Sequence, residues 1–241
     1  MIAILSDIHG NLPALQAVAA DMQGYPVEGI VLLGDLIDYG MQSNETVRYI
    51  RSAMQDRILV SIWGNHERAI LLSDFTRFSS RRGAECAQYT ASRLTDQTRE
   101  YLDRMLIHDG CHSFELGGKH VLAVHDSLED VYWKAITPDQ PRGDYSAYDL
   151  VLSGHSHDSH VFTRYYDCQD PDRRNKHAVL FINPGSVGQP RNHHPEAQYV
   201  LLDTQTLSVC MRAVPYDVKA AMAAYDGHVD DFYRSRLAFG V

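Results

Sequence analysis

The sequence predicts an α/β fold of mixed sheets flanked by helices, and the spacing of its apolar residues supports this prediction. Short apolar runs at residues 2–5, 30–33 and 58–62 are typical of buried strands. Between them, residues 12–23 and 43–54 carry apolar side chains at helical spacing. A β-α-β-α-β order indicates parallel strands joined by right-handed crossovers. The first quarter of the chain therefore predicts a parallel sheet covered by helices.

Both of these helices have a recognisable start. Asn11 is a typical N-cap, and Pro13 lies in the first turn, where proline fits a helix. Ser43 or Asn44 is expected to cap the second helix.

Residues 67–107 interrupt the alternation of strands and helices. They contain three stretches with helical spacing and no strand pattern between them: Ala69–Leu72, Arg82–Leu94 and Asp96–Met105. Two interpretations of this helical insertion remain open. It caps a pocket at the edge of the sheet, or it covers one face of the sheet.

The second half of the chain predicts strands that are neighbours in sequence and partly antiparallel. Cys111–Leu116 and Lys119–Val124 flank Gly117-Gly118, which is typical of a β-hairpin. Residues 126–148 contain two prolines and predict a loop with at most one helical turn. The remaining predicted elements are strands at 150–152, 160–166, 178–182, 197–203 and 207–214, and a helix from Asp217 to Tyr225.

Composition indicates a globular protein of one domain. Of the 241 residues, 44% are hydrophobic and 22% are charged, which is ordinary for such proteins. No repeat, low-complexity stretch or linker divides the chain, so we expect a single domain over residues 1–241. The formal net charge of -9 argues against a surface that binds nucleic acid non-specifically.

The sequence also predicts a cytoplasmic protein without a membrane partner. No apolar run is long enough to span a bilayer, and the apolar start at Met1–Leu5 is too short for a signal peptide. The four cysteines lie far apart and form no Cys-x-x-Cys pair, which indicates reduced thiols.

Five apolar runs are each followed at once by residues that can bind a metal ion. A buried carboxylate is costly unless a cation or several donors face it. Ligands of parallel sheets bind at the carboxyl ends of the strands, so we expect these five ends to meet at one metal site with Asp35 at its centre. The five segments are Ser6-Asp7-Ile8-His9, Gly34-Asp35-Leu36-Ile37-Asp38, Gly64-Asn65-His66-Glu67, His125-Asp126 and Gly154-His155-Ser156-His157.

The candidate ligands supply oxygen and nitrogen but no sulfur. Such a set suits manganese, iron, zinc, cobalt or nickel. The candidates are too many for one open ion but suffice for two ions that share a carboxylate, and they are Asp7, His9, Asp35, Asn65, His125, His155 and His157. Two ions roughly 3.5–4 Å apart form the clamp that enzymes use for phosphoryl displacement. Glu67 and Asp126 are expected to support ligands or to be solvated.

These motifs, in this order across residues 7–157, resemble the motif set of the calcineurin-like metallophosphoesterases. One such motif alone is weak evidence for the resemblance, whereas five motifs in order, each after a predicted strand, are specific evidence for it. The segment Asn183–Arg191 extends the resemblance to small bacterial and archaeal phosphodiesterases of that superfamily. The resemblance implies a four-layer αββα sandwich of mixed sheets flanked by helices, with a helical insertion near residues 67–107.

The resemblance also implies a role for each matching residue. His66 would donate a proton and contact the transition state, and Asp38 would orient it, although Asp38 could instead be a turn residue or a helix cap. Two divalent or transition-metal ions are implied, with manganese favoured over iron, zinc, nickel and cobalt. One ion would be held by Asp7, His9, Asp35 and His157, and the other by Asp35, Asn65, His125 and His155.

The activity implied is that of a binuclear-metal-dependent phosphoesterase in which a metal-activated hydroxide attacks phosphorus. Protein phosphatases of the superfamily carry arginine after the second Asp of the Gly-Asp-x-x-Asp motif, and this chain has Tyr39 there. We therefore expect a phosphodiesterase that acts on a small-molecule phosphoester, with nucleotides among the candidates. Tyr39 and Arg191 are the candidate substrate contacts, although Arg191 could equally be a surface residue.

Two alternatives to a phosphodiesterase remain open. One is a phosphomonoesterase or a dinucleoside-polyphosphate hydrolase of the same fold. The other is a non-catalytic binding scaffold of the metallophosphoesterase fold. The complete ligand set and the retained His66 argue against a scaffold, because a scaffold needs neither.

Overall fold

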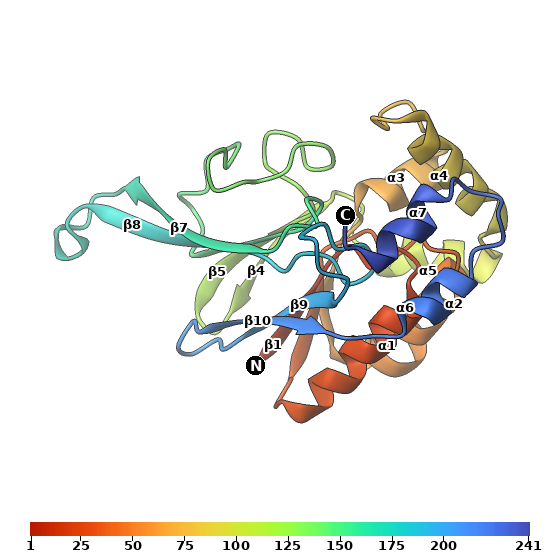
Figure 1. The fold of residues 1–241 in the computed structure, drawn as a ribbon. Helices are drawn as coiled ribbons and strands as arrows, with labels where there is room; N and C mark the ends of the chain where they lie inside the picture. The colour runs from red at the N-terminus through yellow and green to blue at the C-terminus, as the bar shows by residue number, and fades with distance from the viewer.

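The computed structural model describes residues 1–241 and contains two mixed five-stranded sheets (Figure 1). In the first sheet β1, β2 and β3 are parallel, as predicted, while β9 is antiparallel to β1 and β10 to β9. In spatial order, this sheet consists of β10 (Val209–Val214), β9 (Ala197–Leu202), β1 (Ile2–Leu5), β2 (Gly29–Leu32) and β3 (Ile58–Ser61).

The predicted hairpin forms one edge of the second sheet. Its first two strands pair antiparallel, the next two pairings are parallel, and the last pairing is antiparallel. The sheet consists, in spatial order, of β4 (Cys111–Leu116), β5 (Lys119–Val124), β6 (Leu150–Ser153), β8 (Lys176–Asn183) and β7 (His160–Asp167). The predicted α/β fold of mixed sheets is therefore confirmed.

The two sheets share one apolar core between them. Alternate side chains of a strand point to opposite faces, so one set from each sheet reaches the space between the sheets. Ile4 and Val31 of the first sheet and Leu152 and Ile182 of the second belong to this cluster and are fully buried. This core brings the carboxyl ends of strands from both sheets close to one another.

Helices cover the outer face of the first sheet. These include α1 (Leu12–Asp21) and α2 (Ser43–Tyr49), whose Leu15 and Val47 are buried against side chains of β1 and β2. Asn11 caps α1 as predicted, because its side chain accepts the N–H of Ala14 at 3.2 Å.

The start of α2 differs from the prediction. Gln42 is the N-cap, and its side chain makes no hydrogen bond to the helix. The hydroxyl of Ser43 does not cap the helix either, because it accepts the backbone N–H of Asp38 at 3.0 Å. The helix continues into a π-helical turn at Ile50–Met54.

The helical insertion forms three helices, as predicted: α3 (Asn65–Leu72), α4 (Arg81–Arg93) and α5 (Asp96–Met105). The interpretation that the insertion covers one face of the sheet holds for α4 and α5. Ala87 and Leu102 are buried in the core on the outer face of the first sheet. Phe78, between α3 and α4, instead lies with its ring centroid 5.1 Å from that of His66.

The segment of residues 126–148 covers the outer face of the second sheet. It contains turns and bends but no helical turn, and its Ile136 and Tyr145 pack against Val151 and Phe181. Pro138 and Pro141 account for the irregular backbone, since neither can donate to a helix.

Near the C-terminus, α6 spans Val218–Ala223, which is shorter than predicted, and α7 spans Phe232–Ser235. The sequence did not predict α7, because four residues are too few for a helical pattern. In Figure 1 the helices gather at one side of the sheets, and the β7–β8 hairpin projects from the other.

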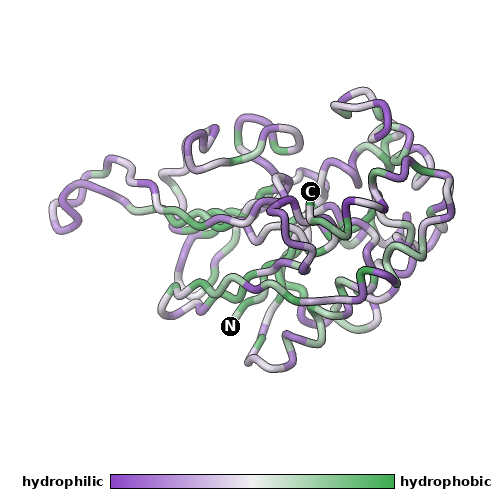
Figure 2. Tube along the Cα trace, viewed as in Figure 1, coloured by the Kyte–Doolittle hydropathy of each residue, from purple (hydrophilic) through white to green (hydrophobic).

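Hydropathy follows this architecture. Figure 2 shows the apolar segments concentrated in the sheets and polar residues at the tip of the β7–β8 hairpin. None of the helices has the length and apolar character needed to cross a membrane. All four cysteines are free thiols.

Truncating a side chain between the sheets should destabilise the protein. Leu152 is fully buried there, so Leu152→Ala is expected to lower the free energy of unfolding by about 2–5 kcal/mol. Leu59→Ala is the matched control, because Leu59 is 50% exposed on the edge strand β3. Urea unfolding with a metal chelator measures both variants. Equal losses in the two would contradict the position of the core.

Candidate metal centre

The predicted ligands converge where β1, β2, β3, β5 and β6 end. All of them are buried except His155, whose side chain is 25% exposed. Three overlapping groups among the buried acidic and histidine side chains have ligand atoms within 4.8 Å of one another: Asp7, His9 and His157; His9, Asp35 and His66; Asp35, His125 and His155.

The first cluster of ligand atoms lies between Asp7, His9 and His157. The Nδ1 of His9 donates to the carbonyl of Ile37 at 3.2 Å, and the Nδ1 of His157 donates to that of Gln189 at 2.6 Å. A neutral imidazole has one proton, so both Nε2 atoms carry bare lone pairs. The two Nε2 atoms face each other at 3.1 Å. Asp7 Oδ1 lies 3.2 Å from His157 Nε2, and this oxygen has no hydrogen-bond partner.

Protonation of the two rings does not remove the repulsion between their Nε2 lone pairs. Burial lowers the pKa of His9 well below its usual value, and it outweighs the nearby Asp35 carboxylate. Burial and the charge of Arg191 likewise lower the pKa of His157. Both rings are therefore neutral at pH 7, and a cation would satisfy all three acceptors at once.

The second cluster lies between Asp35, Asn65, His125 and His155. Asn65 Oδ1 is 3.0 Å from His125 Nε2 and 3.0 Å from His155 Nδ1. The Nδ1 of His125 donates to the carbonyl of Leu33 at 2.6 Å, so its Nε2 points into the cluster. Burial lowers the pKa of His125, but the carboxylates of Asp35 and Asp7 raise it to about 10. These residues also form a set that can hold a cation.

Asp35 lies between the two clusters. Its Oδ2 is 3.7 Å from His9 Nε2 and 3.4 Å from His125 Nε2, while its Oδ1 accepts the backbone N–H of His66 at 2.9 Å. Burial would raise its pKa, but His125 and His66 hold it well below the usual range. One oxygen of an ionised carboxylate thus faces both sets of acceptors, which fits a shared ligand of two ions.

Backbone strain is concentrated in this site. A positive φ is uncommon for residues other than glycine and persists only where the surroundings enforce it. Such φ angles, between 49° and 73°, occur at Asp7, His9, Asp35, Asp38, Tyr39, His155 and His157. The loops are therefore held in conformations that the chain would not adopt without strong contacts.

Glu67 supplies some of these contacts. Its buried carboxylate accepts the backbone N–H groups of Asp35 and Leu36 at 2.8 Å each and of Gly64 at 2.9 Å. The expectation that Glu67 might be solvated is wrong, and the overlooked signal is a glutamate three residues after the Gly64 N-cap. Asp126 is also buried, with its Oδ2 3.4 Å from His155 Nε2.

Two glycines allow the loops to approach each other. A Cβ atom on Gly64 would lie 2.0 Å from Asp35 Oδ1, and one on Gly154 would lie 2.0 Å from the hydroxyl of Ser6. A larger residue at either position would move a loop that carries ligand candidates.

His66 lies within hydrogen-bond distance of Asp38. Its Nδ1 lies 2.6 Å from Asp38 Oδ2, and its Nε2 is 3.9 Å from Asp35 Oδ2. The other oxygen of Asp38 accepts the hydroxyl of Thr90 at 2.6 Å. Burial lowers the pKa of His66, but Asp35 and Asp38 outweigh it and raise the pKa above its usual value. Sequence reasoning missed Thr90, because it lies on α4, far from any motif.

The two candidate substrate contacts lie beside the first cluster. The ring of Tyr39 has its centroid 4.5 Å from that of His9 and 4.4 Å from that of His66, and it stacks on Tyr233 at 4.5 Å. Arg191 is exposed, and its backbone N–H donates to the carbonyl of His157 at 3.3 Å.

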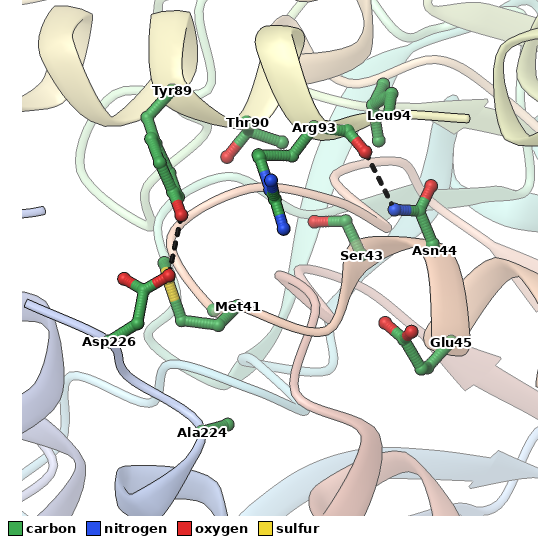
Figure 3. Close-up of a pocket in the computed structure, with 11 residues that line it drawn as sticks. Met41, Ser43, Asn44, Glu45, Tyr89, Thr90, Arg93, Leu94, Ala224 and Asp226 are labelled. Carbon is green, nitrogen blue, oxygen red and sulfur yellow. Dashed lines mark hydrogen bonds between the residues drawn. The ribbon is translucent and has the colours of Figure 1, made fainter. Parts of the chain in front are cut away.

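A cavity of about 250 Å³ lies between α2, α4 and the segment after α6 (Figure 3). Its lining includes Ser43 and Thr90, which both bond to Asp38, and the Tyr89 hydroxyl donates to Asp226 at 2.6 Å. None of the ligand candidates lines this cavity, so it is not the candidate metal centre.

Comparison with known proteins agrees with the motif resemblance. Residues 1–207 match the calcineurin-like phosphoesterase superfamily domain. The chain is 31% identical over 232 residues to an uncharacterized protein of Methanocaldococcus jannaschii, MJ0912, covering 92% of this chain and 90% of that one. A metallophosphoesterase from Sphaerobacter thermophilus is similar at 25% identity and a TM-score of 0.74, over 100% of this chain and 99% of that one. The hypothetical protein PH1004 from Pyrococcus horikoshii OT3 shares the fold, with a TM-score of 0.82 at 23% identity over the same shares.

Removing one acceptor oxygen of Glu67 should destabilise the site. In Glu67→Gln an amide group would face buried N–H donors, so the free energy of unfolding is expected to fall by about 2 kcal/mol or more. Glu85→Gln is the control, because Glu85 is half exposed and only pairs with Arg81 on the surface of α4. Urea unfolding measures both, and indistinguishable midpoints would show that Glu67 does not hold the loops.

Proposed function

The chain belongs to the calcineurin-like phosphoesterase superfamily, and from this membership we propose that it is a metal-dependent phosphodiesterase of small molecules. The observation that carries the proposal is the pair of acceptor clusters that share Asp35 Oδ2. The cluster of Asp7, His9 and His157 lacks donors, and together the two clusters match the ligand set of two ions.

We assign one ion to the ligands Asp7, His9, Asp35 and His157, and the other to Asp35, Asn65, His125 and His155. The oxygen and nitrogen donors suit manganese, and iron, zinc, nickel or cobalt would also fit. When bound, such ions would offset phosphate charge and lower the pKa of the attacking water. Three of the four candidate histidine ligands are held by backbone carbonyls, so their side chains would bind the ions in fixed positions.

His66 is the proposed proton donor to the leaving oxygen. Its Nδ1 is held by Asp38, which leaves Nε2 directed toward the clusters. Thr90 fixes Asp38 from the opposite side. General acid catalysis of this kind typically contributes about 10²–10⁴-fold to the rate.

The wall beside His66 favours a diester over a monoester. Tyr39 and Phe78 lie against this ring, and both are uncharged, since burial raises the pKa of the Tyr39 phenol far above neutrality. A diester carries a second organic group, which suits this aromatic wall, whereas a monoester carries only one. Arg191 and Tyr39 are the proposed substrate contacts, and a nucleotide is one substrate that fits.

Turnover of bis(4-nitrophenyl) phosphate with added manganese tests the proposal. The wild-type protein should hydrolyse it, and Asp35→Asn should lose at least about 1,000-fold, because several kcal/mol of charge stabilisation disappear with the ions. Metal content should fall in the same variant. An inactive wild type with every first-row metal, or an active and fully metallated Asp35→Asn, would refute it.

The role of His66 predicts a dependence on the leaving group. His66→Gln should keep its metal and lose about 10²–10⁴-fold with a methyl phosphodiester, whose leaving alkoxide needs a proton. The loss should be much smaller with a 4-nitrophenyl ester. His112→Gln, at an exposed position on β4, is the control. Equal losses on both esters would count against proton donation.

A further inference from the structure

Asp126 is an unexplained buried acid at the edge of the metal centre. It follows His125 directly and is completely buried, and neither of its carboxylate oxygens has a hydrogen-bond partner. A buried carboxylate without a partner is costly, so such a group persists where a nearby charge or proton compensates it. The ionisable group facing it is His155, whose Nε2 lies 3.4 Å from Asp126 Oδ2.

His155 differs from the other histidines among the candidate ligands. His9, His125 and His157 each donate Nδ1–H to a backbone carbonyl, which fixes the ring and leaves Nε2 for the cluster. The ring of His155 has no backbone partner, and it is reversed: Nδ1 faces Asn65 Oδ1 at 3.0 Å, and Nε2 faces Asp126. It is also the most exposed of the four, so packing restrains it least.

We propose that Asp126 is a positioning residue that does for His155 what backbone carbonyls do for the other three. A cation held at Nδ1 of His155 requires that the single ring proton sit on Nε2, and Asp126 accepts that proton in a hydrogen bond. The pair fixes the ring and makes its Nδ1 a stronger donor. The inference rests on the proposed metal centre and concerns only the ion held by Asp35, Asn65, His125 and His155.

Cadmium-113 NMR of the full chain tests this without any phosphoester. Wild-type protein loaded with cadmium should give two resonances, which His155→Ala and His157→Ala assign to the two ions. In Asp126→Ala the resonance that depends on His155 should shift, and cadmium affinity at that ion should fall about 10–100-fold. The resonance that depends on His157 should stay in place.

Two further variants separate positioning from folding. Asp126→Asn keeps the volume and one acceptor oxygen, so its affinity should lie between those of the wild type and Asp126→Ala. Asp139→Ala, an exposed position in the same segment, should leave both resonances unchanged. Unchanged binding in both Asp126 variants, or equal weakening of both ions, would overturn the inference while leaving the proposed function intact. A wild type that binds cadmium normally but turns over no phosphoester would refute only the proposed function, and one that binds no cadmium at His155 would refute both.

Discussion

Two unprotonated imidazole nitrogens face each other at 3.1 Å in the interior of this protein, on His9 and His157. Each ring uses its one N–H group to donate a hydrogen bond to a backbone carbonyl. The adjacent Asp7 oxygen adds negative charge and so does not reduce the repulsion between the two nitrogens. Lone pairs at this distance in a medium of low dielectric repel strongly. A cation bound between them would convert this contact into a favourable one.

The fold provides that support at the ends of its strands. The core between the sheets fixes where β1, β2, β5 and β6 end. Hydrogen bonds to backbone groups of the loops that follow hold these loops in place. Glu67 gathers the amides around Asp35, and Gly64 lets that loop approach within a distance that a side chain would prevent. The strained φ angles of the ligand residues are a consequence of this pinning.

Much of this arrangement was predictable from the sequence, because strand ends are marked by an abrupt change from apolar to polar residues. The five motifs and the parallel order of the first strands predict that Asp35, His125 and their partners lie at one edge. The three helices of the insertion were also predictable, since their helical periodicity is clear. The α-helix that escaped prediction, α7, is a single turn, which is too short for a helical pattern.

No local sequence pattern indicates which distant segments of the chain will be in contact. Thr90 reaches Asp38 across 52 residues, and nothing around it distinguishes it from a surface threonine. A local contact also escaped prediction: Ser43 or Asn44 was predicted as a helix cap, but the Ser43 hydroxyl accepts the Asp38 amide, five residues earlier in the chain. The positive φ angles at aspartate and histidine were equally invisible, because local propensity disfavours them and only the assembled site enforces them.

The most direct test of this account is anomalous diffraction from crystals soaked in manganese, recorded at the manganese absorption edge. The account predicts two peaks, roughly 3.5–4 Å apart, that both contact Asp35 and are flanked by the His9 and His157 pair on one side and the His125 and His155 pair on the other. A single peak, or manganese bound without contact to Asp35, would contradict it.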